Sequence, residues 1–163
     1  MKNDLDLVAG LPITKVTNNE EPTMFTSVSS RSASAYQRVN VETAVSEATP
    51  YQLVKMMLDS LILNIGAARV AMGRGDIVVK CEKITKAVRI LDEGLKPALN
   101  LAQGGELASN LNNLYAYCLY RLTEANMSNN DAALAEVLGL MEPLADGWSQ
   151  ISGQVATEVG HSH

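Results

Sequence analysis

Histidine is almost absent from this chain: the two that occur, His161 and His163, stand together at the C-terminal end of the printed sequence. An imidazole-dependent catalytic or metal site therefore cannot be assembled within the predicted helices. The acidic residues are spaced like solvated charges on helix faces, without the pairing that acid/base catalysis needs. We expect no enzymatic activity, no metal site and no cofactor.

Long basic runs and long apolar runs are also missing. The chain carries 13 Lys and Arg against 18 Asp and Glu, a net charge of -5, which leaves no electrostatic footprint for nucleic acid or anionic lipid. No apolar stretch approaches the roughly 18 to 20 residues of a membrane span, and residues 1–14 lack the basic start and sustained apolar centre of a signal peptide. We expect a cytoplasmic protein with no nucleic-acid partner and no membrane insertion.

Cysteine is scarce, with Cys81 and Cys118 as the two examples. Both fall on apolar helical stripes, a position typical of buried free thiols. A disulfide would need an oxidising compartment, which the N-terminal sequence does not indicate. We interpret both as free cysteines in the core.

The two ends of the chain show no lasting hydrophobic periodicity. Residues 1–35 are polar and end in a Ser-rich run, so we predict a disordered extension there, of which residues 1–23 have no assignable function. Residues 36–45 alternate apolar and polar side chains, which predicts a short strand or an extended segment lying on a surface. Residues 153–163 are predicted to form a flexible tail. One domain over 36–152 remains between these ends.

Four stretches within this domain repeat apolar residues at alternating gaps of three and four, the rhythm of helices that face one another. Thr49 and Pro50 predict the start of the first helix, which ends near Met72 at the GRG turn (73–75). The second runs from 76 to about 101, the third follows the QGG turn (103–105), and the fourth follows SNND (128–131). Short turns force antiparallel neighbours, so the sequence predicts an all-α, up-down-up-down four-helix bundle. The predicted core positions are Val54, Leu58, Leu61, Ile65, Ala68 and Met72; Ile77, Cys81, Ile84, Val88, Leu91, Leu95 and Ala98; Leu107, Leu111, Leu114, Cys118 and Leu122; and Leu134, Val137, Met141, Leu144, Trp148 and Ile151.

Two prolines interrupt this simple pattern. Pro97 lies in the last turns of the second predicted helix, and Pro143 lies in the middle of the fourth. Each removes one backbone hydrogen bond, so each kinks or ends its helix. The helix boundaries near both prolines stay open at this stage.

Three of the four helices also carry apolar residues on the side opposite the core stripe. These residues are Met56, Leu63, Val70, Val79, Ile90, Leu101, Tyr120 and Met127, with Leu119 on the flank of the third helix. Scattered apolar residues are normal on protein surfaces, and the segment 36–48 could lie over some of them. Two further interpretations are a binding surface for a partner segment and a face through which the protein self-associates.

Short motifs in the same order resemble the flagellin-specific export chaperones of bacterial flagella, the FliS family. They are AYQ and NVETAV within 35–45, ATPYQLVKMMLD (48–59), GRGD (73–76), LDEGLK (91–96), GGELASNLNNLY (104–115), RLTEAN (121–126), and Trp148 with Ile151. The resemblance covers residues 35–151 without interruption. It implies a cytoplasmic four-helix bundle that performs no covalent chemistry.

The resemblance implies a specific partner as well. The disordered C-terminal segment of flagellin is expected to wrap around the bundle one-to-one, which prevents premature polymerisation and presents flagellin to the export apparatus. A flagellar export gate protein and an anti-sigma factor are secondary partners that the sequence leaves open. Tyr36 matches a family tyrosine, so we expect it to act as a lid or as a contact. Tyr115 and Tyr117 are expected on the flanks with solvated hydroxyls. The expected partner-binding residues are Tyr36, Val41, Met56, Leu63, Val70, Val79, Ile90, Leu119, Tyr120 and Met127.

Overall fold

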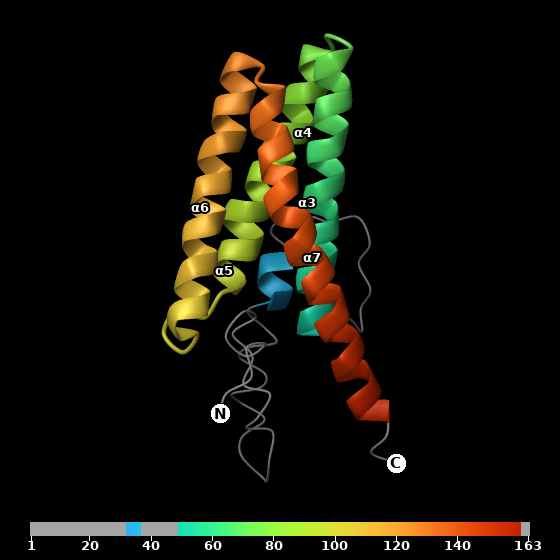
Figure 1. The fold of residues 1–163 in the computed structure, drawn as a ribbon, viewed down its shortest axis with the longest axis vertical. Coiled ribbons are helices and arrows are strands. Elements are labelled where there is room, and N and C mark those ends of the chain that lie inside the picture. Colours follow the sequence, from blue (N-terminus) through green and yellow to red (C-terminus); the bar gives the residue numbers. More distant parts are fainter. Residues whose placement is uncertain (1–31, 37–48, 161–163) are drawn as a thin grey trace.

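The computed structural model describes residues 32–36 and 49–160, with side chains described as far as Ile151. Every element of the described part is a helix, which confirms the predicted all-α fold class. Long helices pack side by side into an antiparallel four-helix bundle (Figure 1). The elements are α3 (Pro50–Gly73), α4 (Ile77–Arg89), η2 (Ile90–Leu95), α5 (Lys96–Ala98), α6 (Gly105–Ser128) and α7 (Asp131–Gly160).

The first helix begins at a capping box, as its sequence indicates. The backbone N–H of Gln52 donates to the Thr49 hydroxyl at 3.2 Å, while the Gln52 side chain accepts from the Thr49 N–H at 2.8 Å. These bonds satisfy two donors that a helix start leaves unpaired. After α3, Gly75 adopts a φ of 73°, and the Asp76 side chain accepts from the Val79 N–H at 3.1 Å. A tight turn therefore connects the end of α3 directly to the start of α4.

The second predicted helix is interrupted before Pro97. Residues Ile90–Leu95 form a π-helix, in which the Lys96 N–H donates to the Leu91 carbonyl five residues back. Pro97, within α5, has no N–H and so leaves the carbonyl four residues earlier without its helical donor. The helix ends at Ala98, three residues before the predicted end at 101, because Leu99 is already extended.

The second proline has a smaller effect, since α7 continues through Pro143. Proline removes the donor that would have bonded to the Gly139 carbonyl, four residues earlier. Both Pro143 and Gly139 are exposed, so solvent can satisfy that carbonyl. The helix extends to Gly160, where the sequence predicted a flexible tail from residue 153.

The core lies along the facing sides of the four helices. All predicted core positions of α3 except Met72 are buried, as are those of α7 except Leu144 and Ile151; these three residues are partly buried. At one end, the Trp148 indole N–H donates to the Tyr51 carbonyl at 2.9 Å, and the two rings pack with centroids 5.8 Å apart. Residues 32–36 form a helical turn whose Ala35 and Tyr36 join this core. The prediction of disorder to residue 35, and of extended structure at Tyr36, is wrong over this turn.

A lysine, Lys80, is buried where α4 meets the end of α6. Only 2% of its surface is exposed, and its ammonium donates to the Asn126 carbonyl at 2.8 Å and to the Asn129 side chain at 2.6 Å. Asn129 ends α6 in a left-handed conformation with φ of 51°. A cation at a helix C-terminus interacts favourably with the carbonyls left unpaired there. Lys80 therefore ties α4 to the α6–α7 turn.

Replacement of Lys80 by Met should lower the free energy of unfolding by about 1 to 3 kcal/mol, because two acceptors in part-buried hydrogen bonds lose their donor while the aliphatic packing is kept. Urea denaturation measures this change. Lys83→Met, one turn along α4 and only half-buried, is the control and should change stability by less than about 0.5 kcal/mol. Equal stability of both variants would show that Lys80 does not hold the turn.

Candidate binding surface

Two helices each expose a pair of large apolar side chains that are spaced along the helix. On α3, Leu63 is 72% exposed and Val70 is 54% exposed; on α6, Tyr120 is 66% exposed and Met127 is 78% exposed. Each pair is separated by seven residues, or two helical turns, so its members lie on one face. We call Leu63 and Val70 the α3 strip, and Tyr120 and Met127 the α6 strip.

The two strips lie on opposite corners of the bundle. α3 packs against α4 and α7, and α6 packs against the same two helices, which puts α3 and α6 on a diagonal. Figure 1 shows this arrangement, with α7 in front, α4 behind, and α3 and α6 on either side. A single straight helix therefore cannot cover both strips.

An open pocket of about 590 Å³ lies beside the α3 strip. It is lined by Gly66, Arg69, Val70, Met72, Gly73, Asn129, Asp131 and Leu138. A side chain at Gly66 would have its Cβ more than 4 Å from any neighbour, so packing does not require a glycine there. The pocket can accept an apolar side chain from outside.

An ion pair borders this pocket. The Arg69 guanidinium binds Asp131 through two bonds, of 2.8 and 3.0 Å, and so links α3 to the start of α7. This hydrogen bonding lowers the pKa of Asp131 and raises that of Arg69. Both side chains are substantially exposed, so the pair mainly orients the α6–α7 turn and adds little stability.

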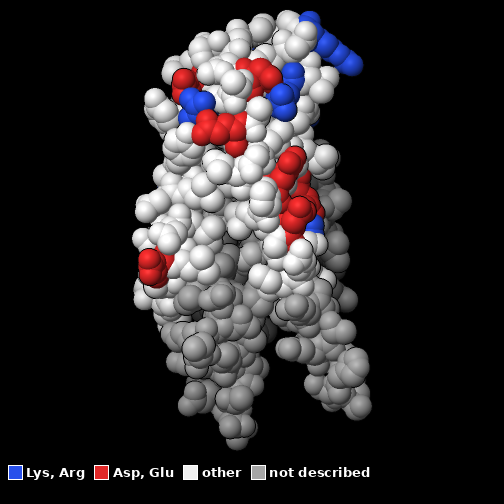
Figure 2. All heavy atoms as spheres, in the orientation of Figure 1, with Lys and Arg blue, Asp and Glu red and all other residues white. Residues whose placement is uncertain are grey.

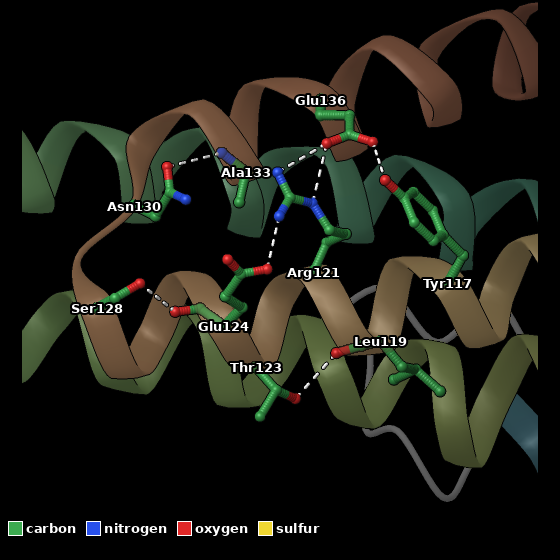
Figure 3. Close-up of polar contacts among 9 residues, drawn as sticks. All are labelled: Tyr117, Leu119, Arg121, Thr123, Glu124, Ser128, Asn130, Ala133 and Glu136. Carbon is green, nitrogen blue, oxygen red and sulfur yellow. Dashed lines mark hydrogen bonds and ion pairs between the residues drawn. The ribbon is translucent and has the colours of Figure 1, made fainter.

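The other flank of α6 is closed against α7 by a polar network (Figure 3). Arg121 binds Glu124 on its own helix at 2.5 Å and Glu136 on α7 at 2.8 Å, and the Tyr117 hydroxyl donates to Glu136. The Tyr117 hydrogen bond, followed by Arg121, lowers the pKa of Glu136. The α6 side chains that point toward α7 therefore form hydrogen bonds and ion pairs within the protein. The side chains of the α6 strip take no part in this network.

Comparison with known proteins identifies the family of this chain. A family model described as "Flagellar protein FliS" matches residues 32–155. The chain belongs to the FliS family. The flagellar secretion chaperone FliS of Salmonella typhimurium is 44% identical over 118 residues, covering 72% of this chain and 87% of that protein. FliSB of Pseudomonas aeruginosa is 42% identical over 117 residues (72% and 92% coverage), and FliS of Bacillus subtilis is 34% identical over 116 residues (71% and 82%).

Membership of the FliS family supports a role as a chaperone in flagellar export, which points away from enzymatic activity. Within the ranges 32–36 and 49–160, no group of His, Cys, Asp and Glu could hold a metal ion. None of the helices in that part combines the length and apolar character that crossing a bilayer requires.

The structure separates the expected contact residues of this FliS-family chain into groups. Leu63, Val70, Tyr120 and Met127 are exposed, as the helical period predicted. Three others are partly buried: Met56 and Leu119 pack against the core, and Val79 lies beside the buried Lys80. Val41 lies outside the described residues. Tyr36 is 7% exposed, so it could contact a partner only after moving out of the core.

The predicted outward position of Ile90 is wrong, because the residue is completely buried. The π-helix widens the turn that begins at this residue, and both Ile90 and Leu91 then point into the core. The predicted seam of α4 is also displaced: Lys80 and Ala87 are buried, while Cys81 and Val88 are only partly buried and Ile77 is exposed.

The expectation for Tyr115 is wrong as well. Its side chain is 2% exposed, and burial raises its pKa well above the ordinary value, so the hydroxyl is not solvated. The α6 seam runs through Ala108, Leu111, Tyr115 and Cys118, whereas Leu107 and Leu114 flank it. Tyr117 lies on the flank as predicted, but its hydroxyl binds Glu136.

Several exposed features were missed from the sequence. Val78, next to Ile77 at the start of α4, is 77% exposed. It stands nearly opposite the buried seam of α4, and the correct helical phase would have revealed it. The pocket at Gly66 was also missed, although an unexplained glycine within a helix is a signal for such a feature.

The two cysteines are free, as predicted, but their surroundings differ: Cys118 is buried and Cys81 is half-buried. Burial raises the pKa of the Cys118 thiol to about 11. At pH 8, iodoacetamide should therefore modify Cys81 well before Cys118, because only a thiolate within reach reacts. Peptide mass spectrometry measures the two rates. Denaturation should equalise them, and equal rates in the native protein would contradict the buried position of Cys118.

Proposed function

We propose that this chain is a cytoplasmic chaperone that binds the C-terminal segment of flagellin one-to-one, prevents its premature polymerisation and delivers it to the flagellar export apparatus. The observation that supports this proposal is the pair of exposed apolar strips on diagonal helices of a FliS-family bundle. An apolar surface of this kind is a property of sites that receive another polypeptide. Binding alone performs the function, without any bond being made or broken.

Because the two strips lie on diagonal helices, a client that covers both must wrap around the bundle. Helices about 10 Å in diameter, with axes 8 to 10 Å apart, make half the circumference of the bundle roughly 40 Å. An extended chain spans this distance with about a dozen residues. A disordered segment can therefore place one apolar stretch on Leu63 and Val70 and a second on Tyr120 and Met127. A folded globular client could not reach both.

Burial of the exposed apolar area can offset the free-energy cost of ordering such a segment. Full burial of an aliphatic or aromatic side chain contributes about 1.5 to 3 kcal/mol, so covering the four partly exposed side chains contributes roughly 4 to 8 kcal/mol. Ordering a disordered partner costs about 2 to 5 kcal/mol or more. The difference favours a complex that forms but can be released for export.

Substitution of either strip should weaken binding. Leu63→Asp with Val70→Asp, and separately Tyr120→Asp with Met127→Asp, should each raise the Kd for the flagellin C-terminal segment of the same cell by about 10-fold or more, since each removes one contact region. Isothermal titration gives the affinity and the stoichiometry, and circular dichroism confirms that each variant is folded.

The matched control is Val78→Asp with Leu101→Asp, which places the same charges on exposed apolar positions outside both strips. It should bind like the unaltered protein. Normal affinity of both strip variants would overturn the proposed client surface. Light scattering distinguishes self-association through the same strips, because it would then show a concentration-dependent dimer in place of a one-to-one complex with the client.

Gly66 gives a second test, in which stability and binding change in opposite directions. Glycine within a helix costs about 1 kcal/mol relative to alanine, and open space surrounds this position. Gly66→Leu should therefore raise the urea midpoint while filling part of the pocket and weakening flagellin binding severalfold. Gly139→Leu on the exposed side of α7 is the control, which should change stability without changing affinity. Unchanged affinity of Gly66→Leu would exclude the pocket from the client site.

A further inference from the structure

The pocket beside the α3 strip has a polar edge as well as apolar walls. Val70 on α3 and Leu138 on α7 supply apolar surface, and Asn129 lines the pocket from the α6–α7 turn. Arg69 and Asp131 line it too, but they are bound to each other. Of the lining residues that the structure describes, Asn129 is therefore the neutral polar side chain that a client group would meet.

Asn129 is held in one conformation by its backbone and by its side chain. Its backbone N–H donates to the Ala125 carbonyl, and its left-handed φ of 51° is one that asparagine tolerates better than most residues. Its amide oxygen accepts from the Lys80 ammonium at 2.6 Å. Lys80 is buried and also binds the Asn126 carbonyl at 2.8 Å, so it is fixed in turn. The amide of Asn129 is thus oriented before any client arrives.

The contact with Lys80 determines which end of the amide faces outward. An ammonium group only donates hydrogen bonds, so the atom that faces Lys80 is the amide oxygen and not the nitrogen. The oxygen and nitrogen of an amide point in different directions, so the two N–H donors of Asn129 are directed away from Lys80. Asn129 is exposed. A polypeptide that enters the pocket can therefore meet a fixed N–H donor at its edge.

The charges around the pocket favour a neutral client group. The Arg69–Asp131 ion pair adds no net charge to the lining. Figure 2, drawn with α7 in front, shows basic and acidic side chains next to one another near the upper end of the bundle. A client carboxylate in the pocket would lie near Asp131, and a client ammonium would lie near Arg69, so either would meet a like charge. A backbone carbonyl accepts from an N–H donor without that cost.

We propose that the Asn129 amide donates a hydrogen bond to a backbone carbonyl of the flagellin segment, next to the apolar client side chain that fills the pocket. Lys80 is the positioning residue that orients this amide from behind. The inference rests on the proposed function and deepens it. Apolar contacts are non-directional, whereas a hydrogen bond requires a defined geometry. The Asn129 contact therefore fixes the register of the client along α3.

The substitution Asn129→Asp tests the donor. Aspartate has nearly the same shape, tolerates the left-handed backbone and still accepts from Lys80, but it presents an acceptor where the amide presents N–H donors. The Kd for the flagellin C-terminal segment should rise by about 5- to 20-fold. The urea midpoint should stay the same or rise, because the bond to Lys80 then joins two charged groups. Normal affinity of the folded variant in isothermal titration would overturn the proposal.

The matched control is Asn130→Asp, the same substitution one residue further along the turn. The Asn130 side chain accepts from the Ala133 N–H at 3.2 Å at the start of α7, and aspartate can accept this bond equally well. The control adds the same charge to the same turn, outside the pocket lining. It should bind like the unaltered protein. Equal weakening by both substitutions would assign the effect to charge and overturn the proposed hydrogen bond.

A double-mutant cycle tests the positioning role of Lys80. Lys80→Met should weaken client binding by about 2- to 5-fold in the presence of Asn129, because the amide is then free to rotate. In an Asn129→Gly background the same substitution should have little effect on the Kd, since glycine keeps the left-handed backbone and has no amide to orient. Circular dichroism confirms that each variant is folded. An equal loss of affinity in both backgrounds would show that Lys80 does not act through Asn129.

The outcomes separate this inference from the proposed function. If Gly66→Leu weakens binding while Asn129→Asp binds normally, the pocket remains part of the client site and the Asn129 contact is excluded. If the variant with Leu63→Asp and Val70→Asp also binds normally, the proposed function itself fails at the α3 strip.

Discussion

The arrangement of this protein depends on one geometric constraint: a helix in a four-helix bundle can bury only one side against its neighbours. The alternating gaps of three and four keep a continuous seam facing the core, and residues such as Leu58 and Leu61 become fully buried there. Apolar residues two turns apart on the opposite side, such as Leu63 and Val70, then have no partner within the bundle. Their burial requires a polypeptide segment outside the described helices. The FliS family supplies the context in which that exposure is useful.

Rigid connections between the helices keep the exposed strips in place. Lys80 ties α4 to the end of α6, and the Arg69–Asp131 pair ties α3 to the start of α7. Both links converge at the α6–α7 turn, close to Val70 and Met127. The spacing between the strips is therefore set by the folded bundle, so that in the proposed complex the cost of ordering falls mainly on the client. Binding of a disordered segment to a rigid protein gives a complex that is specific but can still dissociate.

Much of the fold follows from local sequence patterns. The capping box at Thr49, the Gly75 turn and the seam of α3 each depend on nearby residues and can be predicted from them. Ile90 could not be placed, because α4 passes into a π-helix at this residue and that π-helix packs against both α3 and α6, contacts that no local pattern reveals. Tyr115 was misplaced by one helical position, since Leu114 fits an apolar stripe equally well in a one-dimensional pattern. The burial of Lys80 depends on acceptors 46 and 49 residues away, which no local pattern reveals.

The central claim is that one client covers both strips at once, and hydroxyl-radical footprinting of the one-to-one complex with the flagellin C-terminal segment tests it most directly. Oxidation of Leu63, Val70, Tyr120 and Met127 should fall together on binding, while oxidation of Tyr117, which lies on the α6–α7 flank, should persist. A complex that forms with these four side chains still oxidised at the rate of the free protein, or with only one strip protected, would contradict the account.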